Sequence, residues 1–83
     1  MAVFFKTHTT SSGSWTRIAS ESTVCRATIK LDNRGGTIRV NGLPASGVAL
    51  AANEQITLNR VDLYDIETEG HGTIWYTFAE TRI

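Results

Sequence analysis

The chain is poor in the residues on which most enzymes and metal sites depend. Its 83 residues include one cysteine, one proline and two histidines. One cysteine excludes an internal disulfide, and His8 and His71 do not have the spacing of a zinc motif. No Gly-x-Ser-x-Gly nucleophile elbow, phosphate-binding glycine loop or EF-hand loop occurs. We therefore expect no enzyme activity, no catalytic residues, no metal and no cofactor.

Net charge and long hydrophobic runs are missing as well. Eight basic and eight acidic residues cancel, which removes the positive field expected of a protein that binds nucleic-acid phosphates. No apolar segment approaches the ~20 residues needed to cross a bilayer. The N-terminal sequence MAVFFKTHTT also lacks the charged start of a signal peptide. We expect a protein that is made in the cytoplasm and binds neither nucleic acid nor membranes.

The charges are unevenly distributed along the chain. Residues 1–41 carry six basic and two acidic side chains, whereas residues 42–83 carry two basic and six acidic ones. One interpretation is that the two halves neutralise each other as cross-strand pairs. The other is a molecule with a basic and an acidic face that docks head to tail on its own copies or on a charged lattice. Zero net charge favours self-association in either case.

Short alternating apolar segments, separated by glycine-rich turns, are what the chain does contain. In the clearest segment, residues 24–31, every second residue from Cys25 to Leu31 is apolar, which is the period of a half-buried strand. Cys25 falls on the apolar side, so we expect a buried, inert thiol. About seven such segments, spaced roughly 8–12 residues apart, predict an all-β fold, a small antiparallel β-sandwich or barrel.

The turn residues predict how these strands are connected. Residues 32–36, Asp-Asn-Arg-Gly-Gly, predict a hairpin that leads into a strand over residues 37–41. Residues 41–47 contain the single proline and predict a loop. Residues 61–66 have apolar side chains at spacings of two and three, which fits a bulged strand or a single helical turn, and we favour the strand.

The N-terminus is predicted to be an arm. Residues 2–6 are mainly apolar and could form an edge strand or an extended arm, and the following residues to Ser14 are mainly Thr, Ser and His. This composition predicts an arm and polar connector over residues 1–14, followed by a β-sandwich domain over residues 15–83. Such an arm would reach a partner by strand addition through Val3, Phe4 and Phe5.

The last strand is apolar on both faces. Ile74, Tyr76 and Phe78 share one face, and Trp75 lies on the other. Such a strand is usually covered on its second side by an arm, another subunit or a partner. Because we take the face of Ile74 as the packed one, Trp75 is the first candidate for a partner contact, and Tyr64 is the second.

The order of these segments resembles that of the small β-sandwich accessory proteins of tailed bacteriophage virions. The resemblance covers residues 26–78 and rests on ATIKLDN, TIRVNG, VALAANEQITL, VDLYDIET and GTIWYTF. It implies a virion structural protein, such as a capsid decoration or cement protein that binds and stabilises the assembled shell. The implied partners are the major capsid protein or other virion subunits, and the implied state is a small homo-oligomer. The resemblance supplies no catalytic residues.

Two alternatives remain open. The first keeps the protein in the virion but places it in the neck or tail, as an adaptor or fibre module. The second is a glycan-binding attachment module that acts through Trp75, Tyr64 and an acidic cluster. That cluster consists of Asp62, Asp65, Glu67 and Glu69.

Overall fold

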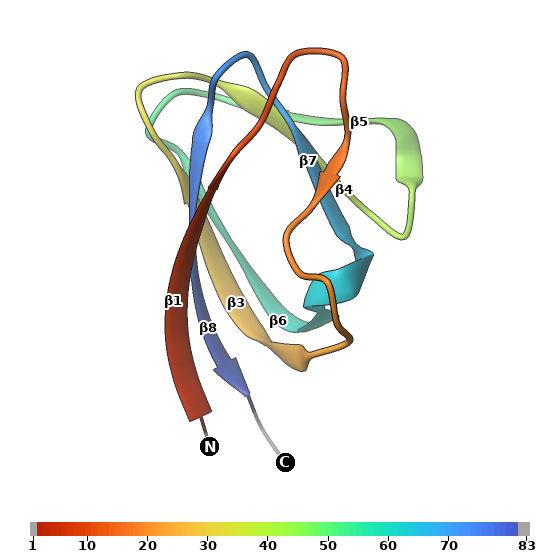
Figure 1. Ribbon diagram of the computed structural model, residues 1–83, viewed down its shortest axis with the longest axis vertical. Helices are drawn as coiled ribbons and strands as arrows, with labels where there is room; N and C mark the ends of the chain where they lie inside the picture. The colour runs from red at the N-terminus through yellow and green to blue at the C-terminus, as the bar shows by residue number, and fades with distance from the viewer. Residues whose placement is uncertain (1, 82–83) are drawn as a thin grey trace.

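Residues 2–81, the part of the chain that this computed structural model describes, form eight β-strands and one short 3₁₀ helix. In chain order these are β1 (Ala2–Thr9), β2 (Thr16–Arg17), β3 (Val24–Leu31), β4 (Gly36–Val40), β5 (Leu43–Leu50), β6 (Gln55–Asp62), η1 (Leu63–Asp65), β7 (Ile66–Glu69) and β8 (Ile74–Thr81). The strands make two four-stranded antiparallel sheets (Figure 1). Sheet A has the order β1-β8-β3-β6, and sheet B has the order β2-β7-β4-β5. The predicted small antiparallel β-sandwich is confirmed.

The core lies between the two sheets. Its buried apolar side chains are Ile18, Cys25, Ala27, Ile29, Leu31, Ile38, Leu63, Ile66, Trp75 and Ala79. The alternation predicted for β3 is therefore present in the structure. Cys25 is a free, buried thiol as predicted, and burial followed by the negative charge of Asp62 raises its pKa.

The predicted hairpin between β3 and β4 is wrong, because these strands belong to different sheets. The glycine-containing turn after β3 carries the chain from sheet A to sheet B. A Cβ atom at Gly36 would lie 2.5 Å from Cζ2 of Trp75. The glycine therefore lets the backbone cross closely over the indole ring. Turn residues mark where the chain changes direction, but they do not tell which sheet receives the next strand.

The loop predicted over residues 41–47 is present only at its start, and residues 43–47 belong to β5 instead. Asn41 and Gly42 have φ angles of 56° and 69° and form a two-residue hairpin turn between β4 and β5. β5 then begins at Leu43, and its pairing with β4 shifts so that residues 44–47 lie opposite Arg39. Pro44 is tolerated because β5 is the edge strand of sheet B.

The predicted N-terminal arm is part of the sandwich. Each residue of β1 pairs with one of β8, from Ala2 opposite Thr81 to Thr9 opposite Ile74. Beyond β1, Thr10 is fully buried, and its backbone N–H donates to the carbonyl of Thr73 at 3.0 Å. The division into an arm over residues 1–14 and a separate domain therefore does not hold for the described residues.

Between β6 and β7, residues 63–65 form η1. The single helical turn is therefore present there, and the favoured prediction of a continuous strand is wrong. Asp62 caps η1, because its Oδ1 accepts a hydrogen bond from the backbone N–H of Tyr64 at 3.0 Å.

Candidate interaction surface

The orientation of β8 defines the most exposed aromatic surface of the described chain. β8 lies beside β3, with Trp75 opposite Leu31 and Ala79 opposite Ala27. Directly opposed residues in an antiparallel pair share a face, so Trp75 points into the core together with the apolar side of β3. Tyr76 and the other even-numbered residues of β8 therefore point away from the core. The assignment of the two faces in the sequence analysis is reversed.

The neighbouring strand β1 adds its outward side chains to this surface. Phe5 lies opposite Phe78, and the rings of Phe5 and Tyr76 are stacked with centroids 6.3 Å apart. Phe5 is 61% exposed and Phe78 is 44% exposed. We call Phe5, Ile74, Tyr76 and Phe78 the aromatic face. Ile74 and Tyr76 are half-buried, so Phe5 and Phe78 form most of the exposed part of this face. Exposed apolar side chains that lie together typically mark an interaction site.

Polar and basic residues of β3 and β6 border the aromatic face. Thr28 lies opposite Phe78, and Lys30 lies opposite Tyr76. The hydroxyl groups of Thr28 and Thr57 are hydrogen-bonded at 3.1 Å. An apolar centre with a polar border is the usual anatomy of a protein–protein interface.

At one end of the aromatic face, a shallow hollow extends from Phe5 and Tyr76 to the turn after β3. Arg34 in this turn donates a hydrogen bond to Asp32 at 3.0 Å and another to the carbonyl of Gly72 at 3.2 Å. Desolvation alone would raise the pKa of Asp32, but hydrogen bonds from backbone N–H groups and the Arg34 guanidinium together lower it. The carboxylate therefore serves to order the turn.

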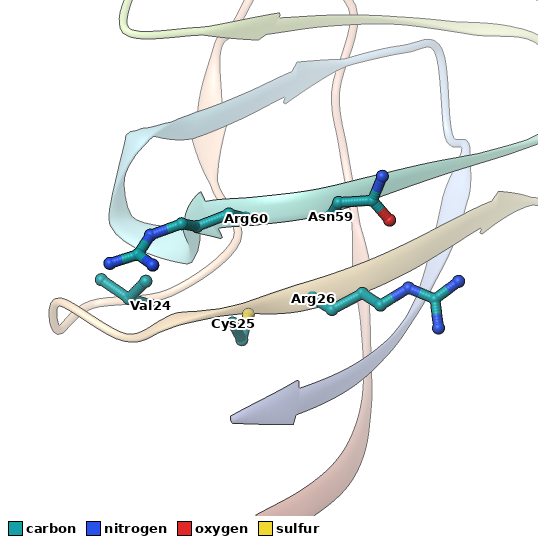
Figure 2. A pocket seen from close by; sticks show the side chains of 5 residues that line it. All are labelled: Val24, Cys25, Arg26, Asn59 and Arg60. Carbon is teal, nitrogen blue, oxygen red and sulfur yellow. The ribbon is translucent and has the colours of Figure 1, made fainter. Parts of the chain in front are cut away.

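A second hollow lies where β6 bulges against β3. It measures about 440 Å³ and is lined by Val24, Cys25, Arg26, Asn59 and Arg60. This volume would suit a small ligand. Figure 2 shows, however, that the guanidinium groups of Arg26 and Arg60 point in different directions. Because the Cys25 thiol has a raised pKa and the two basic groups do not converge, this hollow is a weak candidate for a binding or catalytic site.

Tyr64, the second predicted contact residue, is exposed but lies beside sheet B. The guanidinium carbon of Arg17 lies 4.4 Å from the centroid of its ring. Arg39 stacks in the same way on Trp15 at 4.1 Å, and it also forms a 3.0 Å ion pair with Glu67. Phe5 belongs to the outer face of sheet A, so the fold does not bring Phe5 and Tyr64 into one surface.

The predicted partner contact at Trp75 is wrong. Its side chain is completely buried, and Nε1 donates to Oγ1 of Thr10 at 3.0 Å. The ring of His8 stacks on the indole with centroids 6.2 Å apart. Trp75 is a core residue, and the residues on the outer face that sequence reasoning missed are the half-buried Tyr76 and the exposed Phe78. The position of β8 directly beside β3 would have identified them, but it is not encoded in a local pattern.

The other predicted contacts, Val3 and Phe4, lie in β1 opposite Glu80 and Ala79. Their side chains are outside the part of the chain that the structure describes in side-chain detail.

Two polar side chains, Lys6 and His8, lie on the inward side of β1. Nζ of Lys6 donates to the carbonyl of Ile18, and Nε2 of His8 lies 2.8 Å from Oγ1 of Thr68. When the Thr68 hydroxyl donates its proton to the carbonyl of Thr16 at 3.3 Å, Nε2 of His8 is the donor in the 2.8 Å bond. Nδ1 is buried and has no partner among the described residues. Burial and then the charge of Lys6 lower the pKa of His8 to about 4.

The acidic side chains of the predicted cluster bind different partners in the structure. The hydroxyl of Ser22 and two backbone N–H groups lower the pKa of Asp62. Glu67 pairs with Arg39 on the neighbouring strand, which supports cross-strand neutralisation for this pair. Glu69 accepts a hydrogen bond from the backbone N–H of Gly13 at 2.6 Å. Within residues 2–81, no three His, Cys, Asp or Glu side chains gather as metal ligands.

Comparison with family models, with curated proteins and with solved structures gives no match for this chain. None of the helical structure within residues 2–81 is long and apolar enough to span a membrane.

Proposed function

We propose that this protein is a structural protein of a tailed-bacteriophage virion, which binds and stabilises the assembled capsid shell through its aromatic face. The observation that carries the proposal is the exposure of Phe5 and Phe78 beside Tyr76 on the outer face of sheet A. The order of segments over residues 26–78, which resembles that of virion accessory proteins, supports the choice of the major capsid protein as partner.

Burial of this face would provide the binding free energy. Covering the exposed parts of Phe5 and Phe78 contributes about 1 kcal/mol for each side chain. A protein that binds only the assembled shell shifts assembly towards the shell by mass action. No chemical step is involved, so the function is one of contact and stabilisation.

Co-sedimentation with shells that lack the protein tests the docking face. Phe78→Lys places a charge in the aromatic face and should abolish binding. Leu43→Lys is the matched control, because Leu43 is 69% exposed but lies on the β4–β5 hairpin of sheet B, and this variant should bind like the wild type. Circular dichroism shows whether both variants are folded. Equal binding by both folded variants would overturn the docking face.

Copy number in purified virions tests the location. Quantitative mass spectrometry against the major capsid protein should give a simple ratio to the capsid subunit, with roughly hundreds of copies in each particle, as expected for decoration under the symmetry of the shell. Roughly a dozen copies would place the protein in the neck or tail. Absence from virions would remove the virion proposal.

A further inference from the structure

Within residues 2–81 the two sheets have four edges, and only one of these edges is long and regular. β2 has two residues, β5 contains Pro44 and a shift in pairing, and β6 bulges opposite Arg26. These are the features by which proteins protect sheet edges from further pairing. β1 has none of these three features, since its eight residues pair with β8 without a break; the charged side chain that it carries, Lys6, points inward and donates to the carbonyl of Ile18. Figure 1 shows β1 at the border of its sheet.

The backbone of β1 offers a complete set of hydrogen-bonding groups on its free side. The N–H of Thr10 donates to Thr73, so the backbone groups of Thr10 point towards β8. The direction of these groups alternates along a strand, so those of Val3, Phe5, Thr7 and Thr9 point outward. An edge with outward groups and an AVFFKTHT sequence is a template for another strand.

We infer that β1 pairs antiparallel with β1 of a second copy of this chain, around a twofold axis at Phe5. In this arrangement the outward N–H and C=O groups of Phe5 bond to those of Phe5 in the second copy, and Val3 pairs with Thr7 on each side. The interface is isologous and closes as a dimer, so it leaves no free β1 edge.

Symmetry and charge together select this register. A twofold axis perpendicular to the sheet leaves the outer face of each copy on the same side of the joined sheet. Opposed residues share a face, and faces alternate along a strand, so the axis must pass where one residue lies opposite the same residue of the second copy. Axes at Phe5 and at Lys6, near the middle of β1, let the largest number of β1 residues pair with β1 of the second copy. An axis at Lys6 sets two lysines directly opposite each other, which is destabilising. An axis at Phe5 places two exposed aromatic residues side by side and sets Lys6 opposite Phe4.

The dimer also has a consequence for the aromatic face. Four strands about 4.8 Å apart and about 26 Å long give one copy a face of roughly 500 Å². A standard stable interface buries about 800 Å² on each partner, so the face of one copy lies at the lower end of the range. Pairing through β1 joins the two sheets A into one of eight strands and connects the two aromatic faces at Phe5. The inference rests on the edge of β1, so it does not depend on the proposed shell binding.

Disulfide trapping tests the register. In a Cys25→Ala background, Phe5→Cys places two thiols on the axis with Cα atoms about 5.5 Å apart, within the range of a disulfide. Thr7→Cys is the matched control, because each Thr7 lies opposite Val3 and the two Thr7 residues are about 13 Å apart. Mild oxidation should give a covalent dimer with Phe5→Cys and not with Thr7→Cys. The reverse result, or no dimer with either variant, would overturn the register.

Sedimentation equilibrium tests the edge itself. Wild type should dimerise, and Thr7→Pro should be at least tenfold weaker, because it removes an outward N–H but no hydrogen bond to β8. Phe78→Lys should dimerise like the wild type, since Phe78 is one strand away from the edge. A monomeric wild type, or a folded Thr7→Pro that dimerises normally, would overturn the inference. Loss of shell binding by a dimeric Phe78→Lys would leave both proposals standing, whereas retained shell binding would overturn the docking face alone.

Discussion

Acidification should weaken this fold through His8. In the folded chain the pKa of this ring falls from its ordinary 6.5 to about 4 because of burial and then the charge of Lys6. Between these two values the unfolded chain binds more protons than the folded chain, so the free energy of unfolding decreases as the pH falls. The stabilising contribution of neutral His8 is therefore complete above pH 6.5 and is lost as the pH falls towards 4.

The size of this effect follows from the pKa and the surroundings of the ring. At 1.36 kcal/mol for each pH unit, the full difference corresponds to about 3 kcal/mol. The ring is only partly buried, so solvent screening reduces this to on the order of 1–2 kcal/mol. Protonation also turns the unpartnered Nδ1 into a donor, for which the described interior offers no acceptor.

Urea unfolding followed by tryptophan fluorescence measures this contribution, since His8 stacks directly on Trp75. Wild type should lose on the order of 1–2 kcal/mol more than His8→Gln between about pH 7 and about pH 4.5, because glutamine keeps an N–H donor but does not titrate. Contributions from carboxylates, including Asp32 and Asp62, are common to both proteins and cancel in the difference. His71→Gln, at an exposed histidine, should follow the wild-type profile. Equal losses in wild type and His8→Gln would refute the assignment to His8.

Two further predictions concern the turns. Gly36→Ala should lower the free energy of unfolding by about 1–3 kcal/mol, since its Cβ would meet the Trp75 ring at 2.5 Å; an unchanged thermal midpoint would show that the crossing does not need glycine. Asp62→Ala should cost about 1–2 kcal/mol in urea unfolding, because it removes the cap of η1, which accepts from the Tyr64 N–H, and also the acceptor for the Thr23 N–H. Unchanged stability in this variant would mean that water replaces the carboxylate.

The sequence predicts local structure better than the pairing of distant segments. The alternation from Cys25 to Leu31 predicts β3 and its buried side, because a half-buried strand must alternate. The Asp32–Gly36 turn is also located from its residues. Its destination in sheet B depends on the close approach to Trp75, some forty residues later in the chain, and no local pattern contains that contact.

The candidate surface illustrates the same limit. The apolar residues on both faces of β8 indicate that one face is covered by the core and the other meets something else, but the period of two is identical for both faces. The register with β3 decides between them, and it directs Trp75 inward and Phe78 outward. Likewise, the apolar start of the chain is compatible with an arm or an edge strand. Pairing with β8 along its whole length decides for the edge strand.

The placement of aromatic residues gives the strongest physical reason to expect a partner. A domain of this size buries only roughly 60–65% of the surface of its unfolded chain, so each large apolar side chain left outside is one that a thin core could have used. Phe5, Tyr76 and Phe78 nevertheless lie on the outer face of sheet A, while small residues such as Ala27, Ala79 and Thr77 fill the inner face behind them. In the isolated chain, these three rings contribute less to folding than they would in the core. The favourable free energy of burying these rings is gained only when another surface covers them. A dimer joined through β1 would present six such rings together to one partner.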